Sequence, residues 1–332
     1  MSIEYTAIKL VKRPETSITP DLFEVVTLTT PELQDGQILI KQTHMSLDPA
    51  MKGWMMPDRD SYIPPVELGD IMRAGGVGEI IESKNPTMPV GARVQGLIGW
   101  TEYAVSNGDG LNLIPEGVAT EAVLCVLALP GMTAYQGLMN VGKPKPGETI
   151  VVSGAAGSVG SMVGQIAKAE GLTVIGTAGT DEKCRWLTDE LGFDAAINYK
   201  SDGLSEKLAA SAPKGVDLYF ENTGGPVQHA VFDLMNAHGR IMVCGMISDY
   251  NTLTPSAGPN WVPIIKKRLT IQGFTMPDHY DKIPGMMQAM SKYLMEGKIK
   301  YRAHTLHGLE SAIEGINLLF SGGNTGKLMV EL

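Results

Sequence analysis

The sequence predicts an α/β fold with a doubly wound parallel sheet, preceded by a β-rich domain. From about residue 123, short apolar runs alternate with helical segments, the pattern of a parallel sheet covered by helices. Upstream, short apolar runs lie between Gly, Pro and Asn, and no helical period persists. A glycine-rich stretch at 154–160 separates a strand from a helix, as in a βαβ unit. We therefore expect one domain from residues 1–122 and 300–332 and a second from residues 123–299.

The expected elements follow from apolar runs bounded by turn residues and from amphipathic stretches. In the first domain, strands are expected at 38–40, 77–81 and 92–97. In the second domain, strands are expected at 149–153, 173–177, 195–198, 216–221, 240–244 and 269–274. Helices are expected at 162–170 and 283–296. The last segment, 326–332, has a strand pattern with no helix after it, so we expect it to return to the first domain.

The glycine-rich stretch 154–160 has the residues that a pyrophosphate site needs. Its first glycines allow a sharp turn and close approach of the backbone, while the exposed amides of the helix start attract negative charge. We therefore expect a pyrophosphate at this turn and helix start, and expect Gly160 to let helix and strand pack closely. The spacing is Gly-x-x-Gly-x-x-Gly, which also occurs in ordinary tight turns.

The end of the second strand of this unit indicates which dinucleotide is bound. A cofactor without a 2′-phosphate favours Asp or Glu there, but the chain has Ala178-Gly179-Thr180. Lys183 and Arg185 follow at the next helix start and would attract a phosphate. This pattern predicts NADPH rather than NADH. The alternative is that both cations are ordinary solvated helix charges.

Composition excludes several classes of protein. The chain has 332 residues and a formal net charge of -9, which argues against nonspecific binding to nucleic acid or anionic membranes. No apolar run approaches the roughly 18 residues that span a bilayer, and residues 1–30 carry no signal-peptide pattern, so we expect a cytoplasmic protein. Cys125, Cys184 and Cys244 are far apart in sequence, which predicts buried thiols rather than a disulfide framework or a zinc site.

The chain carries a series of motifs in one order, and through them it resembles the zinc-free medium-chain dehydrogenase/reductase family. The resemblance is to the branch of prostaglandin reductases, alkenal double-bond reductases and curcumin-reductase-like proteins. The motifs that carry it are Ser46-Leu47-Asp48-Pro49-Ala50-Met51-Lys52-Gly53-Trp54-Met55, Gly75-Gly76-Val77-Gly78, Leu129-Pro130-Gly131-Met132-Thr133-Ala134-Tyr135, Ala155-Ala156-Gly157-Ser158-Val159-Gly160-Ser161, Asp181-Glu182-Lys183, Asn198-Tyr199-Lys200, Glu221-Asn222-Thr223-Gly224-Gly225 and Cys244-Gly245-Met246-Ile247-Ser248-Asp249-Tyr250-Asn251.

The resemblance implies NADPH-dependent reduction of the carbon-carbon double bond of an α,β-unsaturated aldehyde or ketone, with hydride delivered to the β-carbon. It also implies a Rossmann sheet for the second domain, a GroES-like fold for the first and a homodimer. The residues assigned to the cofactor, from the family or from the strand end discussed above, are Met132, Thr133, Gly157, Ser158, Val159, Gly160, Gly179, Lys183, Tyr199, Asn222, Cys244, Gly245, Met246, Ile247, Ser248, Tyr250, Phe274, Thr275, Met276 and Asn324. Taken alone, Asn222 is equally typical of a residue that stabilises a turn. Tyr199 could equally be a half-buried aromatic residue at a strand end, and its neighbour Lys200 is expected to face solvent.

The reaction needs one hydrogen-bond donor near the carbonyl oxygen, where enolate charge develops. Tyr250 is the candidate for this donor. Its alternative roles are to line the pocket or to be purely structural. The ribose hydroxyl of the cofactor can also donate the bond. Met51, Trp54 and Tyr62 are expected to line the substrate pocket with Tyr250, since Ala50 stands where many relatives have Tyr.

No metal is expected, because residues 69–76 lack the Gly-His-Glu segment of zinc-dependent relatives, and His44 has no cysteine near it.

Other functions remain open at this point. A quinone reductase would share the fold and the cofactor. A noncatalytic protein would bind NADPH without oxidation by any enone, and an alcohol dehydrogenase would require a bound metal. The sequence does not identify the natural substrate, because apolar pockets discriminate poorly between ligands that differ by a methylene group.

Overall fold

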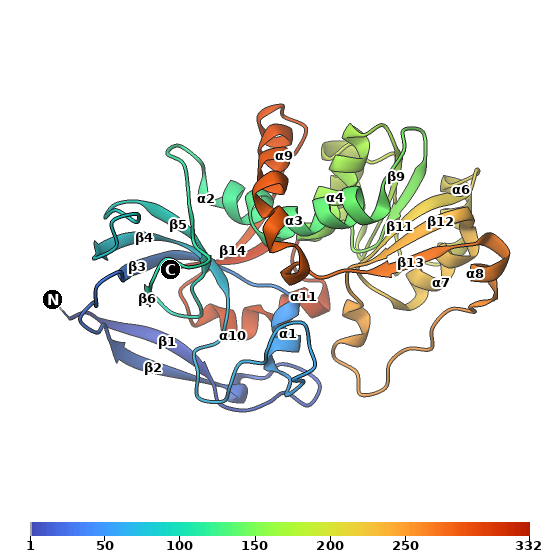
Figure 1. Ribbon diagram of the computed structural model, residues 1–332. Coiled ribbons are helices and arrows are strands. Elements are labelled where there is room, and N and C mark those ends of the chain that lie inside the picture. Colours follow the sequence, from blue (N-terminus) through green and yellow to red (C-terminus); the bar gives the residue numbers. More distant parts are fainter. Residues whose placement is uncertain (1) are drawn as a thin grey trace. The chain divides into compact units, whose positions relative to one another are not determined.

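The computed structural model describes residues 2–332 and divides into two compact units (Figure 1). The first unit comprises the chain up to Leu124 together with Ala303–Leu332, and the second comprises Cys125–Arg302. We describe each unit by itself.

The second unit is built on a six-stranded parallel sheet. Its strands are β8 (Thr149–Val152), β9 (Thr173–Ala178), β10 (Ala195–Asn198), β11 (Val216–Glu221), β12 (Met235–Val243) and β13 (Thr270–Gly273). They lie in the order β10-β9-β8-β11-β12-β13, and all neighbours pair in parallel. The doubly wound sheet predicted from the sequence is therefore confirmed. The order reverses between β8 and β11, and in such folds the ligand crevice lies outside the carboxyl ends of those strands.

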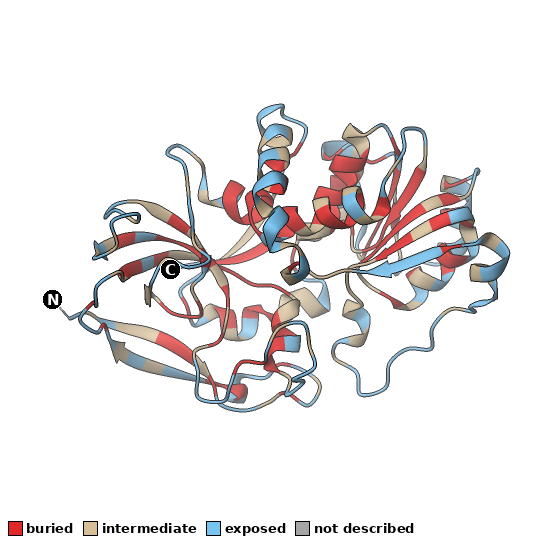
Figure 2. Cartoon of the chain, viewed as in Figure 1, coloured by how far each residue is buried: buried red, intermediate tan, exposed pale blue. Residues whose placement is uncertain are grey.

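Helices cover both faces of this sheet, since right-handed crossovers place α4 on one face and α6 and α7 on the other (Figure 1). The helices are α4 (Ser158–Ala169), α5 (Asp181–Arg185), α6 (Leu204–Ser211), α7 (Gly225–Leu234), α8 (Val262–Lys267) and α9 (Ile283–Met295). The central strands are buried along their length (Figure 2), and Val151, Ile175 and Tyr219 lie in their core. A sheet covered in this way accounts for strands that are almost continuously apolar.

Two elements begin earlier than the sequence predicts. Helix α4 starts at Ser158 rather than at residue 162, so the glycine loop leads straight into the helix. Strand β12 starts at Met235 rather than at residue 240. Its first half is irregular, because the register with β11 shifts there and His238 has a φ of 64°. Such a segment has no alternating apolar pattern to reveal it.

The first unit contains a seven-stranded sheet and a separate hairpin. The sheet consists of β3 (Ile38–Ser46), β4 (Gly75–Ser83), β5 (Arg93–Leu97), β6 (Tyr103–Ser106), β7 (Asn112–Leu113), β14 (Ala303–His307) and β15 (Lys327–Glu331), and the hairpin of β1 (Glu4–Leu10) and β2 (Phe23–Thr29). Strand β15 pairs antiparallel with β3, so the prediction that the C-terminal segment returns to this domain is confirmed. Helices α10 (Ser311–Gly315) and α11 (Asn317–Ser321) precede β15.

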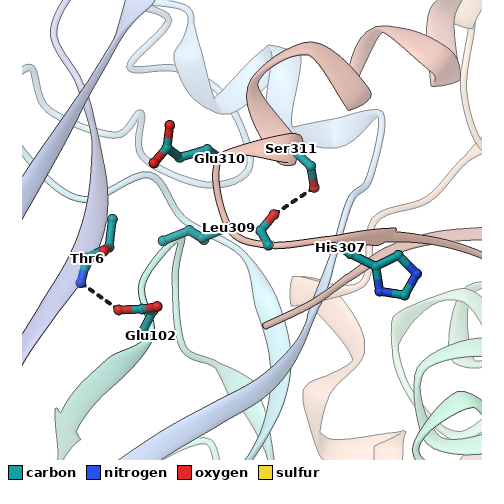
Figure 3. A pocket seen from close by; sticks show the side chains of 7 residues that line it. Thr6, Glu102, His307, Leu309, Glu310 and Ser311 are labelled. Atoms are coloured by element: carbon teal, nitrogen blue, oxygen red, sulfur yellow. Dashed lines mark hydrogen bonds between the residues drawn. The ribbon is translucent and has the colours of Figure 1, made fainter.

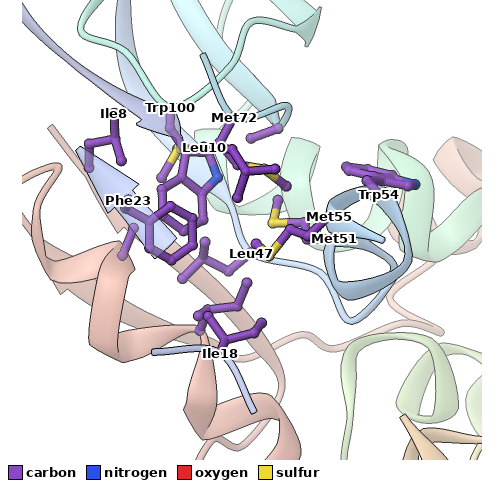
Figure 4. Close-up of a cluster of buried hydrophobic side chains, with 14 of the residues drawn as sticks. Ile8, Leu10, Ile18, Phe23, Leu47, Met51, Trp54, Met55, Met72 and Trp100 are labelled. Carbon is purple, nitrogen blue, oxygen red and sulfur yellow. The ribbon is translucent and has the colours of Figure 1, made fainter. Parts of the chain in front are cut away.

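The sequence analysis predicted no helix in the first unit, which contains α1 (Ala50–Met55) as well as α10 and α11. Helix α1 spans six residues, too few for a helical period to emerge among short strands. Its buried face joins a cluster that holds Met51, Met55, Phe23 and Trp100 (Figure 4), and the rings of Phe23 and Trp100 stack with centroids 5.0 Å apart.

The segment Thr120–Gly142 corrects the expectation that no stretch is apolar and long enough to span a bilayer. It forms a helix of 23 residues that includes α2 (Thr120–Ala122) and α3 (Leu129–Tyr135), joined and followed by π-helical turns. This helix is long enough and its mean hydropathy is high enough for a membrane span, although Thr, Glu, Gln and Pro interrupt its apolar run. Of its most apolar window, 72% is buried inside the protein, as in the core helix of a globular protein, so this is weak evidence for a membrane span.

Candidate cofactor site

The glycine loop joins β8 to α4 with the geometry of an anion site. Gly154 has a φ of 57°, and the Gly157 amide donates to the Gly154 carbonyl at 3.0 Å, closing a tight turn. No side chain caps the start of α4 at Gly157, so the amides of its first turn face the loop. A Cβ at Gly160 would lie 2.5 Å from the Gly154 oxygen, so the close contact that Gly160 allows is between helix α4 and the loop after β8, where the prediction had helix and strand.

At the end of β9, an aromatic residue and two lysines gather around Gly179. A Cβ at Gly179 would lie 3.3 Å from Tyr199 Oη and 3.4 Å from Lys200 Cε. The Lys200 ammonium lies 6.0 Å from the centre of the Tyr199 ring. Burial, and then the positive charge of Lys200, lower the pKa of Lys183, while Glu182 opposes them. Like charges held this close attract an anion.

Lys200 was expected to face solvent, and it is exposed. The sequence analysis did not assign it to the cofactor, although its side chain approaches Gly179. The available signal was its position beside Tyr199 at the end of the third strand, since the carboxyl ends of neighbouring parallel strands meet at one edge of the sheet. Arg185 is also exposed, as expected of a solvated helix charge.

The turn after β11 is tied to the end of β8 and to the segment that follows β12. Asn222 Nδ2 donates to the Ser153 carbonyl at 2.7 Å, so its side chain holds the two strand ends together. In the next segment, Ile247 N donates to the Asn222 carbonyl at 3.2 Å and Ser248 N donates to the Thr223 carbonyl at 3.0 Å. These bonds bring the predicted cofactor residues 244–248 beside Asn222.

Tyr250 follows the short 3-10 helix Ile247–Asp249, and its phenol folds back over its own loop. The phenol oxygen accepts a hydrogen bond from Met246 N at 3.3 Å and would lie 3.1 Å from a Cβ at Gly245. The side chain is partly exposed. The phenol is therefore held against its own loop while it remains accessible to solvent.

Cysteine burial differs from the expectation. Cys125 is buried, but Cys184 and Cys244 are only partly so, and the prediction of three buried thiols was wrong for these two. Cys244 follows the last residue of β12, Val243, instead of packing within the strand. Burial, and then the charge of Glu221, raise its pKa to about 12, which keeps it a thiol rather than a nucleophile.

The remaining predicted cofactor residues of this unit lie on α3 and after β13. Met132 is buried, and the Thr133 hydroxyl donates to the Leu129 carbonyl at 2.7 Å. The Phe274 ring packs edge-on against Phe220, with centroids 6.2 Å apart, so only its backbone faces away from the core. Thr275 Oγ1 donates to Asp278 at 3.0 Å, and Met276 is buried.

The predicted substrate residues and Asn324 belong to the first unit. Met51 is fully buried in the core cluster, Trp54 is nearly so with the Arg73 guanidinium 5.5 Å from its ring centre, and Tyr62 is exposed. Asn324 Nδ2 donates to the Gly326 carbonyl at 3.0 Å.

Each unit also has a cavity that the sequence analysis did not anticipate. In the first unit, a cavity of about 170 Å³ is lined by polar residues of β1, β14 and the turn before α10, including Glu102 and His307 (Figure 3). In the second unit, a cavity of about 400 Å³ lies beside β10 and is lined by Asp181, Cys184 and Lys207 among others. Neither cavity includes a predicted cofactor residue.

The described residues, 2–332, contain no group of three or more His, Cys, Asp and Glu that could hold a metal ion. Burial lowers the pKa of His44, which favours its neutral form, but no second ligand accompanies it. The donor set therefore does not fit a catalytic zinc.

Comparisons with known proteins agree along the whole chain. Residues 6–114 match the family described as "N-terminal domain of oxidoreductase", and residues 158–292 match the family described as "Zinc-binding dehydrogenase". The chain is 40% identical to the NADPH-dependent curcumin reductase of Escherichia coli over 97% of this chain and 95% of that protein. It is 38% identical to the NADP(+)-dependent 2-alkenal reductase of Nicotiana tabacum, over 92% and 90%. The crystal structure of CurA in complex with NADPH from Vibrio vulnificus superimposes with a TM-score of 0.93 at 38% identity, covering 98% of each chain.

Proposed function

The chain belongs to the medium-chain dehydrogenase/reductase superfamily, in the branch of the prostaglandin, curcumin and alkenal reductases, and we propose that it is an NADPH-dependent reductase of the carbon-carbon double bond in α,β-unsaturated aldehydes and ketones. The observation that carries this proposal is a pair of lysines that follow neighbouring strands, Lys183 on α5 after β9 and Lys200 after β10, with no acid at the end of β9, where an NADH enzyme favours one. The full-length likeness to double-bond reductases supports the reaction.

The residues present fit NADPH. The uncapped start of α4 suits the pyrophosphate, and the cations around Gly179 suit the 2′-phosphate. The hydroxyl of Thr177, at the end of β9, is buried without a hydrogen-bond partner, as expected of a side chain beside a ligand site. When bound, NADPH supplies the hydride that is transferred to the β-carbon of the substrate. Because the donor set does not fit zinc, no step of the proposed chemistry uses a metal.

We assign to Tyr250 the donation of a hydrogen bond to the substrate carbonyl. Hydride addition to the β-carbon leaves negative charge on that oxygen, and a positioned donor stabilises it. The Met246 amide that donates to the phenol oxygen holds the hydroxyl in place and strengthens it as a donor. In this proposal the second unit binds the cofactor, and Tyr62 is the one of the three pocket residues predicted in the first unit that is exposed to a substrate, since Met51 and Trp54 pack in the core.

The proposal is tested by following NADPH absorbance with a panel of enals, enones and quinones. We expect oxidation with enals and enones and little with NADH in place of NADPH. Turnover of quinones alone would favour the quinone reductase, and tight NADPH binding with no turnover would favour the noncatalytic protein. Metal detected by elemental analysis would revive the alcohol dehydrogenase.

The role of Tyr250 is tested by Tyr250→Phe, with Tyr280→Phe, at an exposed tyrosine, as the matched control. Loss of one donor to a developing oxyanion lowers kcat by about 100-fold, while KM changes little because the bond strengthens only in the transition state. An unchanged kcat would leave Tyr250 as a pocket wall.

We further propose a homodimer that forms through β13. This strand is the edge of the sheet and is exposed over its whole length (Figure 2). Ile271, Trp261 and Ile265 are exposed apolar side chains on β13 and on or just before α8. An unpaired apolar edge suits antiparallel pairing with the same edge of a second copy about a two-fold axis. In light scattering, Ile271→Lys is expected to give a monomer, while Met295→Lys on exposed α9 stays dimeric. A wild-type monomer would refute the dimer.

The cytoplasmic location stays a prediction.

A further inference from the structure

Glu221, the last residue of β11, is a fully buried carboxylate that the proposed chemistry does not use. Its Oε1 accepts hydrogen bonds from Ser153 Oγ at 2.8 Å, Thr223 N at 2.7 Å and Gly224 N at 2.9 Å. Its Oε2 accepts one from the Tyr219 hydroxyl at 2.7 Å. Burial, and then the charge of Glu221, raise the pKa of Tyr219, so the phenol keeps its proton and donates. Every group around this carboxylate is therefore a donor.

The network crosses the point where the strand order reverses. Ser153 follows β8, and its hydroxyl both donates to Glu221 and accepts from Asn222 N at 2.8 Å. Since β8 and β11 are the neighbours on either side of the reversal, one hydroxyl links the two strand ends that flank the crevice.

The same residue holds the segment after β12. The Glu221 carbonyl accepts Cys244 N at 2.9 Å and Gly245 N at 3.1 Å. Three strand ends therefore meet at Glu221, through its side chain on one side and its carbonyl on the other. Two of the turns that it holds, at Asn222 and at 244–250, carry assigned cofactor residues.

We propose that Glu221 is the positioning residue of the cofactor crevice, and that the hydrogen bonds its carboxylate accepts hold the turns after β8 and β11 in their binding conformation before the cofactor arrives. This rests on the proposed function only for the identity of the ligand, NADPH. A preformed crevice avoids the entropy loss of ordering two turns on binding, so loosening the network weakens affinity without removing any cofactor contact.

The test compares single substitutions that break different parts of the network. Ser153→Ala removes the hydroxyl that bonds both the Glu221 carboxylate and Asn222 N, while Tyr219→Phe removes an equally buried bond that reaches no turn, and so serves as the matched control. Glu221→Leu removes every hydrogen bond that the carboxylate accepts, including a longer one of 3.4 Å from Thr223 Oγ1. In Glu221→Gln, the amide oxygen can keep the donors on Oε1 while its NH₂ faces the Tyr219 hydroxyl, which can rotate to accept.

The measurements are the Kd for NADPH, by fluorescence on the full chain, and amide hydrogen exchange of residues 222–225 and 244–248 without cofactor. We expect about a ten-fold rise in Kd and faster exchange for Ser153→Ala, a larger rise for Glu221→Leu, and changes within about three-fold for Glu221→Gln and Tyr219→Phe. If Glu221→Leu does not fold, the comparison of Ser153→Ala with Tyr219→Phe decides.

If Ser153→Ala and Tyr219→Phe lowered Tm equally and had equal Kd values for NADPH, the network would be merely structural and the proposal would be overturned. If Glu221→Gln weakened NADPH binding as much as Glu221→Leu does, the effect would come from the lost charge rather than from the hydrogen bonds, and the proposal would also be overturned. NADPH binding is measured without substrate, so a failure of enone turnover leaves this test intact.

Discussion

The choice of cofactor depends on a few side chains around Gly179. The missing acid at the end of β9 predicts Lys183 from the sequence, and the family resemblance adds Tyr199. The sequence does not predict the approach of Lys200, since the direction of a side chain after a strand end depends on how β9 and β10 pair. Nor does it predict the network around Glu221, because Ser153 and Glu221 are 68 residues apart in sequence and meet only across the sheet.

Lys183→Glu tests the phosphate assignment at this scale. Replacing a cation by an anion beside the 2′-phosphate is expected to raise the Kd for NADPH by about 10- to 100-fold, as for loss of a charge-assisted hydrogen bond, and to leave that for NADH nearly unchanged. Lys266→Glu on α8 is the control of equal charge change. Equal effects of Lys183→Glu on both cofactors would remove the assignment.

The pH dependence of binding follows from the lowered pKa of Lys183. The 2′-phosphate favours the protonated lysine, so affinity for NADPH falls as pH rises through a pKa below the ordinary 10.5. Lys200→Met removes the repelling charge, which raises the pKa of Lys183 and moves this loss to higher pH. Calorimetry from neutral to alkaline pH measures the shift, with NADH as the reference that lacks the phosphate. If affinity for NADPH fell at the same pH in Lys200→Met as in the wild type, the two lysines would not be coupled.

At the scale of single elements, the sequence predicts the strands of the parallel sheet well because burial on both faces leaves nearly continuous apolar runs. It predicts the start of α4 four residues late and misses α1, because neither a glycine-rich helix start nor a six-residue helix shows a clear apolar period.

Gly160→Ala tests the glycine loop as an element. The new methyl group would lie 2.5 Å from the Gly154 oxygen and 2.8 Å from Ala155 Cα, both backbone atoms that must move. We expect a loss of about 1–3 kcal/mol in the free energy of unfolding, as for other overpacked sites, together with weaker NADPH binding. Gly285→Ala in α9, where nothing lies within 4 Å of the new Cβ, should instead be neutral or gain up to about 1 kcal/mol. Urea unfolding measures both, and equal stability of the two variants would contradict the close packing.

Strand β15 is attached to the segment before α1 by a buried ion pair. Lys327 Nζ lies 2.8 Å from Asp48 Oδ1 and also donates to the Leu47 carbonyl at 2.8 Å. Lys327→Met leaves an uncompensated buried carboxylate and is expected to cost about 3–5 kcal/mol in urea unfolding. Lys12→Met breaks the exposed pair with Asp21 and should have no measurable effect. A similar small effect of Lys327→Met would show that the pair adds little to stability.

At the scale of the whole molecule, the sequence predicts a doubly wound sheet, a β-rich region and the return of the C-terminal strand. The motifs establish the family, and the family carries most of the cofactor assignment. The substrate pocket is less accessible to such reasoning. Met51 and Trp54 prove to be core side chains of the first unit, since side chains that line a pocket and side chains that fill a core have the same apolar character in sequence.

The central claim is that this chain uses NADPH to saturate a carbon-carbon double bond, and the most direct test is the structure of the product. The purified protein is incubated with NADPH and an α,β-unsaturated ketone, and the product is analysed by proton NMR. The account predicts loss of the vinyl signals with the carbonyl group retained and one equivalent of NADPH consumed. Formation of an allylic alcohol, or no consumption of NADPH, would contradict it.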